Sequence, residues 1–286
     1  AGIVSYKTAL DMSLYLDKEE DYVPWKTATS ALAYVGARLS MTSNYGLYQN
    51  YILSKATPVL DKLTFKDDGN YLERYLRDIL FSTTAKFDYQ PAIDKAKELF
   101  KNFMQKNESV KPNFRYVVYN TGVRLGARKE WEFMWKKYQN EVVAEEKKKL
   151  LTSLSSSREA WLLQRCLEYT LNTSLIKSQD GDSVISSVAS NPNGRLLAWD
   201  FFRLHWSTFR SRYGSEAFSF GNLVKAVTTH FQTDFHYNEV KSFFEANPDV
   251  GSAERSLQQA YEAIQSNIQW MKQHEKEVVE WLREHQ

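Results

Sequence analysis

The chain has 286 residues, of which 43% are hydrophobic and 14% aromatic, and 37 basic against 35 acidic residues leave a formal net charge of +2. The one compact basic run, Lys147-Lys148-Lys149, follows two glutamates and is typical of a solvated helix face. We therefore expect no nucleic-acid partner. No apolar run reaches the ~18 residues of a membrane-spanning helix, and the N-terminus lacks a signal-peptide pattern. Because the sequence starts with Ala1 rather than Met, we expect a fragment or a mature piece.

Helical periodicity begins near the N-terminus and continues along the chain. Leu10, Leu14 and Leu16 are expected on one early helix. Pro24 is expected to open a helix over residues 25–39, since the missing N–H of proline is no loss in a first helical turn. Pro91 is expected to do the same for residues 92–104.

Four further segments are predicted to be helical from the spacing of their apolar residues. They are marked by Tyr71, Leu72, Tyr75, Leu76 and Leu80; by Trp131, Phe133, Met134 and Tyr138; by Trp161 to Leu167 around Cys166; and by Leu257, Tyr261, Ile264, Ile268, Met271, Val278 and Leu282. Ser156 and Glu159 have the spacing of a capping box before the third of these. As the only cysteine, Cys166 predicts a buried thiol and excludes a disulfide within the chain.

The stretch NPNGRLLAWDFFRLHW at 191–206 is a turn that leads into an amphipathic aromatic helix. Its Gly194 turn and its stripe of Ala198, Trp199, Phe202 and Trp206 are expected to fix the angle of one helix against its neighbours. Core packing is the expected role of Trp199 and Trp206, with the lining of a concave binding face as the alternative.

About a dozen or more amphipathic helices with short polar breaks, and no alternating strand pattern, predict an all-α fold. Stacked antiparallel helix pairs would bury one face of each helix, so we expect an α-solenoid of degenerate HEAT or armadillo type. No composition shift marks a boundary, and a single domain over residues 1–286 is expected.

Catalytic motifs are not found. His274-Glu275 starts like the zinc motif H-E-x-x-H, but Val278 stands where the second histidine is needed. The sequence contains no G-x-S-x-G, no P-loop and no G-x-G-x-x-G. We therefore expect neither a metal site nor a catalytic residue in this chain.

Five segments occur in the order and spacing of one known family: DYVPW at 21–25 with ALAY at 31–34; Val118-Tyr119, Gly122 and EWEF at 130–133; residues 191–206; FSFGNL at 218–223; and NIQW at 267–270 with Trp281-Leu282. Through them the chain resembles, over essentially its whole length, the C-terminal helical domain of the aminopeptidase N family of zinc metallopeptidases. None of the five is specific alone, but together they are.

The resemblance implies a division of labour within a longer parent protein. An earlier catalytic domain is expected to carry H-E-x-x-H, a distal glutamate ligand, the G-x-M-E-N loop and the zinc cofactor. This C-terminal domain is expected to be a HEAT-like solenoid that encloses the substrate chamber. Its implied partners are the catalytic domain of its own parent chain and peptide substrates, and in some members a second copy in a homodimer.

By resemblance, a loop at residues 218–223 reaches the pocket for the first side chain of the substrate. Phe218 would offer an apolar wall and Asn222 a polar group. An acid-selective relative places an arginine near Ser219, which cannot pair a substrate carboxylate. The resemblance therefore implies a preference for neutral or apolar N-terminal residues. The alternative is that Phe218 and Phe220 are core aromatics at a helix start.

Two N-x-Ser/Thr sequons, at Asn107 and Asn172, are candidate glycosylation sites in polar stretches between helices. They and the resemblance favour a parent in the secretory pathway or at the cell surface, as a type II membrane or otherwise anchored enzyme. Cell-surface relatives usually carry four cysteines in this domain. The corresponding positions here are Ala85, Ala92, Asn120 and Ser156, which leaves a cytoplasmic location open.

A second function, from a different class, also fits the helical pattern. The chain would then be a free-standing helical-repeat scaffold that binds a peptide or a partner helix in its concave face.

Overall fold

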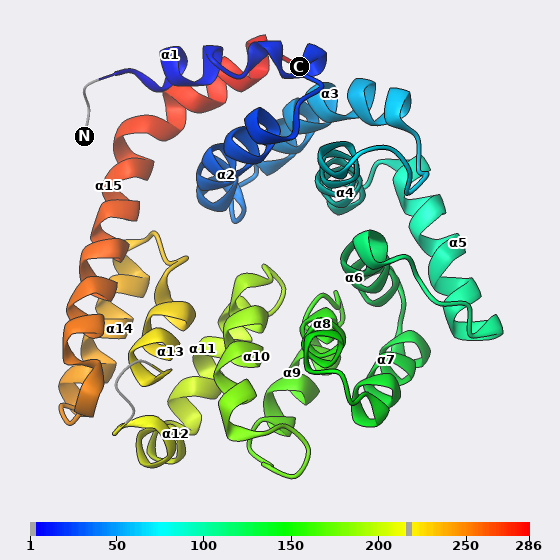
Figure 1. Cartoon of the computed structure of the whole chain (residues 1–286). Helices are drawn as coiled ribbons and strands as arrows, with labels where there is room; N and C mark the ends of the chain where they lie inside the picture. The colour runs from blue at the N-terminus through cyan, green and yellow to red at the C-terminus, as the bar shows by residue number, and fades with distance from the viewer. Residues whose placement is uncertain (1–3, 216–218) are drawn as a thin grey trace. The chain divides into compact units, whose positions relative to one another are not determined.

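The computed structural model describes residues 4–215 and 219–286. Over these ranges the chain forms fifteen α-helices and three short 3-10 helices and no β-strand (Figure 1). The predicted all-α fold class is thereby confirmed.

Packing divides the chain into two compact units. The first comprises Ala1–Gly122 and Gln273–Gln286, and the second comprises Val123–Lys272. Two helices, α6 (Arg115–Leu125) and α15 (Glu254–Glu284), contribute residues to both units. The single domain over residues 1–286 stays a prediction.

The first unit contains the helices of the N-terminal part of the chain and the end of α15. They are α1 (Tyr6–Asp11), η1 (Leu14–Lys18), α2 (Tyr22–Leu39), α3 (Tyr45–Leu63), α4 (Tyr71–Lys86), α5 (Gln90–Lys106), η2 (Pro112–Phe114) and the start of α6. Helix α3 packs against η1, α2 and α4, and α4 packs against α5. At the other end of the sequence, Trp281 is buried against Tyr51 with ring centroids 4.9 Å apart, so the end of α15 completes this core.

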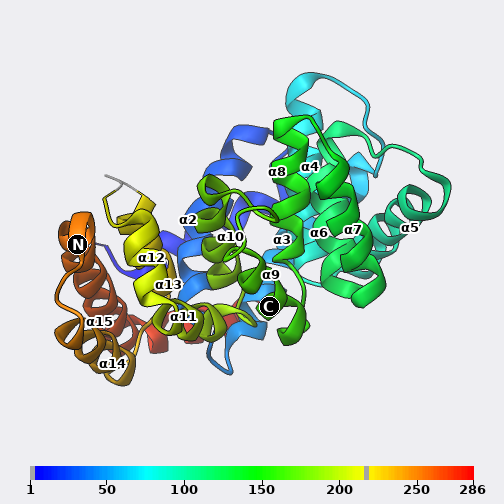
Figure 2. The same cartoon turned by 90° about the horizontal axis from the view of Figure 1, so that it is seen from below.

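The second unit contains the rest of α6 and the helices that follow. They are α7 (Arg128–Asn140), α8 (Ala144–Leu154), α9 (Ala160–Tyr169), α10 (Ser178–Ser190), α11 (Arg195–Leu204), α12 (Trp206–Tyr213), α13 (Ser219–Thr228), α14 (Asp234–Ala246), η3 (Gly251–Ala253) and the first part of α15. Helix α10 packs against α8, α9, α11 and α13 (Figure 2). Buried aromatic side chains such as Trp131, Trp199, Phe202 and Phe220 supply much of the apolar area in this core.

Most contacts within each unit join helices that are close in sequence, which agrees with the predicted solenoid. The pairing of α10 with α13 reaches further along the chain than a strict stack of helix pairs would require. The solenoid itself stays a prediction. In the part of the chain that the structure describes, no helix is both long enough and apolar enough to span a membrane.

The early leucines do not share one helix, as was predicted from their spacing. Helix α1 ends at Asp11, and Leu14 and Leu16 belong to the separate helix η1. The Ser13 hydroxyl donates to the Leu10 carbonyl at 2.6 Å and also bonds the Tyr51 hydroxyl. This local side-chain bond competes with continuation of the helix.

The predicted capping box at Ser156 and Glu159 is also wrong. Helix α9 starts at Ala160, its N-cap is Glu159, and no side chain caps it. Instead, the Ser157 hydroxyl accepts from the Glu159 N–H at 3.1 Å. A complete capping box occurs elsewhere, at the start of α4, where Asn70 and Glu73 satisfy each other's backbone donors.

Candidate functional site

The segment predicted to meet substrate is not a loop over the residues that the structure describes. Phe218 lies outside the described residues. From Ser219 onward the chain is helical, as the first turn of α13. Ser219 is half-buried and Asn222, three residues on, is exposed. Because residues i and i+3 lie on one side of a helix, the two polar side chains share one face of this turn.

Phe220 in the same turn is a core aromatic, as expected if the phenylalanines at this helix start serve packing rather than substrate binding. It is fully buried, and its ring lies 5.3 Å from that of Trp206, centroid to centroid. Trp206 in turn contacts the rings of Phe202, Phe243 and Phe244 at 5.5 to 5.6 Å. Aromatic packing therefore holds the inner side of the α13 turn, while Ser219 and Asn222 remain on the accessible side.

The turn at residues 191–194 fixes the start of α11 through a side-chain amide. Asn191 Nδ2 donates to the carbonyls of Ser155 and Ser157, both at 2.8 Å, and so joins the turn to the α8–α9 connection. A Cβ at Gly194 would lie 2.6 Å from the Val188 carbonyl oxygen, so only glycine allows this close approach. These contacts agree with the role predicted for the turn, which stays a prediction.

The aromatic stripe that follows is shared between two helices rather than one. Ala198, Trp199 and Phe202 are buried on α11, as predicted. The helix then ends, because His205 leaves helical geometry at φ −108° and ψ 23°, and Trp206 begins α12. The break redirects the chain toward the α13 turn.

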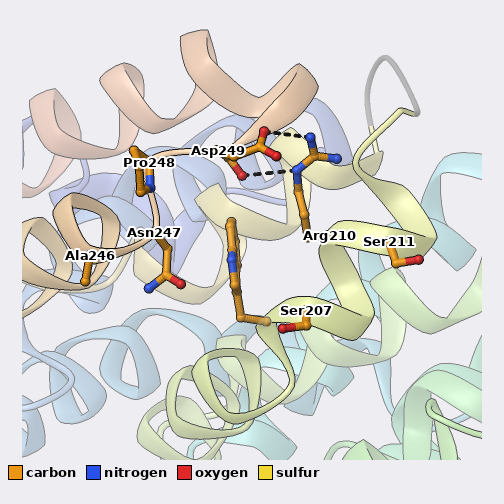
Figure 3. A pocket seen from close by; sticks show the side chains of 8 residues that line it. Ser207, Arg210, Ser211, Ala246, Asn247, Pro248 and Asp249 are labelled. Atoms are coloured by element: carbon orange, nitrogen blue, oxygen red, sulfur yellow. Dashed lines mark hydrogen bonds and ion pairs between the residues drawn. The ribbon is translucent and has the colours of Figure 1, made fainter.

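A polar clasp joins α12 to the connection between α14 and η3. Arg210 Nη2 donates to Asp249 Oδ1 at 2.7 Å, and Arg210 Nε donates to the Asp249 carbonyl at 3.1 Å (Figure 3). The hydrogen bond from the Arg210 guanidinium lowers the pKa of the Asp249 carboxyl, so the pair is ionised near neutral pH.

An open depression of about 510 Å³ surrounds the clasp. Its walls come from α12 and from the segment that follows α14: Trp206, Ser207, Arg210, Ser211, Ala246, Asn247, Pro248 and Asp249. In Figure 3 the Arg210 and Asp249 side chains point toward one another. Its two charged groups are thus already paired with each other.

Gly251 allows the segment that carries Asp249 to approach the end of α12 closely. Gly251 has φ +53°, in the left-handed region, and a Cβ there would lie 2.5 Å from the Gly214 carbonyl oxygen. The Ser252 N–H donates to that same carbonyl at 3.1 Å. The end of α12 is therefore held by backbone and side-chain bonds together.

Two observations bear on metal binding and on nucleophilic chemistry in this chain. Among the residues that the structure describes, no group of three His, Cys, Asp or Glu side chains is placed to hold a metal ion. The Cys166 thiol is fully buried, and burial raises its pKa to about 12, which makes it a poor nucleophile.

Sequence reasoning named Ser219 and Asn222 as candidates but missed the Arg210–Asp249 pair. Pro248-Asp249-Val250-Gly251 is a readable turn signal, since proline and aspartate favour turns and glycine allows a positive φ. The partnership of Asp249 with Arg210, 39 residues away, has no local signal.

Comparison with known proteins agrees with the five segments. A family model described as the ERAP1-like C-terminal domain matches residues 1–266. The chain is 35% identical to aminopeptidase N of Bos taurus over 295 residues, which cover 100% of this chain and 31% of that protein. It is 33% identical to aminopeptidase N of Homo sapiens over 288 residues, covering 96% of this chain and 30% of that protein.

A relative with a different name is equally similar. Aminopeptidase A of Gloydius brevicauda is 34% identical over 284 residues, which cover 99% of this chain and 30% of that protein. The chain thus spans about a third of the length of the curated relatives it matches. It belongs to the ERAP1-like C-terminal domain family and is a C-terminal domain of the aminopeptidase N family.

Proposed function

We propose that this chain is the non-catalytic C-terminal domain of a zinc-dependent aminopeptidase that removes N-terminal residues from peptides. The observation that carries the proposal is the family match over residues 1–266 together with relatives named as aminopeptidases. About two thirds of each relative's length lies outside the match, which leaves room for a catalytic part.

Zinc belongs in that catalytic part rather than here. The sequence has no H-E-x-x-H, and its described residues offer no set of metal ligands. The chain itself is proposed to enclose the substrate chamber. The surface that faces the chamber would also bind the catalytic domain of the parent protein. An enclosed chamber excludes water and orients a peptide for attack.

The first turn of α13 is proposed to shape the pocket for the substrate's first side chain. It presents the half-buried Ser219 and the exposed Asn222, and residues 219–223 carry no charge. Without a cation among residues 219–223, a substrate carboxylate next to them would lose its hydration without gaining an ionic partner. The parent enzyme is therefore proposed to prefer neutral or apolar N-terminal residues.

Overall similarity does not decide this preference, because aminopeptidases N and A match the chain almost equally well. The uncharged residues of the α13 turn support the preference instead. We further propose a parent in the secretory pathway or at the cell surface, with glycans at Asn107 and Asn172. Homodimerisation through this domain is part of the same proposal.

The test compares the isolated chain with the full-length protein on an aminoacyl anilide, with and without added zinc. The full-length protein should turn over, and metal chelation should stop it. The isolated chain, shown to be folded by circular dichroism, should not turn over under either condition. Zinc-dependent turnover by the isolated chain would overturn the proposal.

A further inference from the structure

The first turn of α13 packs very closely against the start of α15, at Gly221 and Ser256. A Cβ built on Gly221 would lie 2.3 Å from Ser256 Oγ and 3.0 Å from Ser256 Cβ. Side chains essentially never approach so closely, so a larger residue at Gly221 must move either the α13 turn or Ser256. Gly221 directly precedes Asn222 in the chain, so a shift of the Gly221 backbone also moves Asn222.

The end of α12, close in sequence to the same turn, is held by the chain segment that precedes Ser256. The Arg210–Asp249 clasp holds the last turn of α12, and the Ser252 N–H donates to the carbonyl of Gly214, which lies five residues before Ser219. Ser252 and Ser256 belong to one continuous piece of backbone, η3 and the start of α15. The end of α12 and the start of α13 are thus both fixed against residues 249–256.

We infer that Gly221 and the Arg210–Asp249 pair are positioning residues, which set where Ser219 and Asn222 stand and thereby tune selectivity for the substrate's first side chain. The inference rests on the proposed function of the α13 turn. None of the three positioning residues needs to touch substrate. Small displacements of groups that orient a substrate have large effects on rate. A shift of the α13 turn is therefore expected to change kcat/KM for the substrates that it contacts.

The test is the ratio of kcat/KM for N-terminal leucine over N-terminal alanine, measured on the full-length protein. Loss of folded enzyme lowers both values by one factor and leaves their ratio unchanged, whereas displacement of the pocket wall changes the ratio. Gly221→Ala should change it by about tenfold, the lower end of the range for gaining or losing one methylene in an apolar pocket.

Two further sets of variants separate positioning from misfolding. In Gly221→Ala/Ser256→Gly both side-chain atoms that the new Cβ would meet are gone, so the ratio should return toward the wild-type value. Arg210→Gln and Asp249→Asn should shift the ratio in the same direction, because each breaks the same pair. The double variant should shift it no further than either single variant does. If Gly221→Ala does not fold, this second set decides.

Matched controls exist for both changes. Gly46→Ala adds a Cβ where no atom lies within 4 Å. Lys272→Gln removes an exposed ion pair of the same unit, Lys272 with Asp234 at 3.0 Å. Neither control should alter the ratio.

Ser219→Ala and Asn222→Ala distinguish the inference from the function on which it rests. If they change the ratio while Gly221→Ala and the clasp variants do not, the positioning inference is overturned and the proposed function stands. If they leave the ratio unchanged, the proposed pocket role is contradicted and the inference falls with it.

Discussion

Asn191 donates a hydrogen bond to the carbonyl of Ser155 at 2.8 Å, and its second amide hydrogen reaches the carbonyl of Ser157 at the same distance. Both serines are buried. Asn191→Ala should lower the free energy of unfolding by about 1–3 kcal/mol, because two carbonyls would be left without a donor. Urea denaturation followed by tryptophan fluorescence measures the change.

The control for this change is Asn238→Ala, at an exposed position of α14 in the same unit. It should stay within about 0.5 kcal/mol of the wild type, as surface substitutions usually do. An Asn191 variant as stable as the control would contradict the role given to this side chain.

His236 should make the stability of the chain sensitive to mild acid. Its ring stacks on Phe231 with centroids 4.5 Å apart, and burial, followed by the charge of Arg195, lowers its pKa despite the opposing effect of Glu239. The unfolded chain then binds a proton more readily than the folded one. Stability from this group is complete above a pH of about 6.5 and is lost as the pH falls below it.

Melting temperatures of the wild type and of His236→Phe, which keeps a ring at this place, would show the effect between pH 7.5 and 5. The wild type should lose more stability than the variant as the pH falls. Parallel curves would contradict the prediction.

Cys166 should resist modification in the folded chain. The thiol is buried, and its raised pKa of about 12 leaves almost no thiolate at pH 8. A disulfide reagent such as DTNB should react with about one thiol per chain in strong denaturant, and far more slowly in its absence. Rapid stoichiometric reaction with the native chain would count against this placement.

Both sequons should accept glycans when the protein is made in the secretory pathway of eukaryotic cells. Asn107 is exposed at the C-cap of α5, and Asn172 is exposed in the turn after α9. Asn107→Gln and Asn172→Gln should each remove one enzyme-sensitive glycan, as seen by gel shift and mass spectrometry. An unmodified protein recovered from the culture medium would contradict the assignment.

The sequence predicted the all-α fold class and the positions of about half of the helices, because long amphipathic periodicity is a strong signal. It failed where short polar side chains decide local geometry. Ser13 ends α1 by bonding a carbonyl, and Ser157 rather than Ser156 bonds the chain before α9. Such competing bonds are equally compatible with a helix or a break when only the sequence is known.

The candidate site also contains residues that the sequence could predict and residues that it could not. Ser219 and Asn222 could be named through family motifs, whereas their support could not. The closeness of Gly221 to Ser256 and the pairing of Arg210 with Asp249 join positions 35 or more residues apart. No spacing rule connects them, since they meet only when α12, α13 and the start of α15 are packed.

The most direct test of the account is the Ser219→Arg variant of the full-length protein, assayed on substrates with N-terminal glutamate and N-terminal leucine. A cation at the start of α13 would pair the glutamate carboxylate inside a partly dry pocket. The account predicts that the ratio of kcat/KM for glutamate over leucine rises by about tenfold or more. An unchanged ratio in an active, folded variant would show that this turn does not meet the substrate's first side chain.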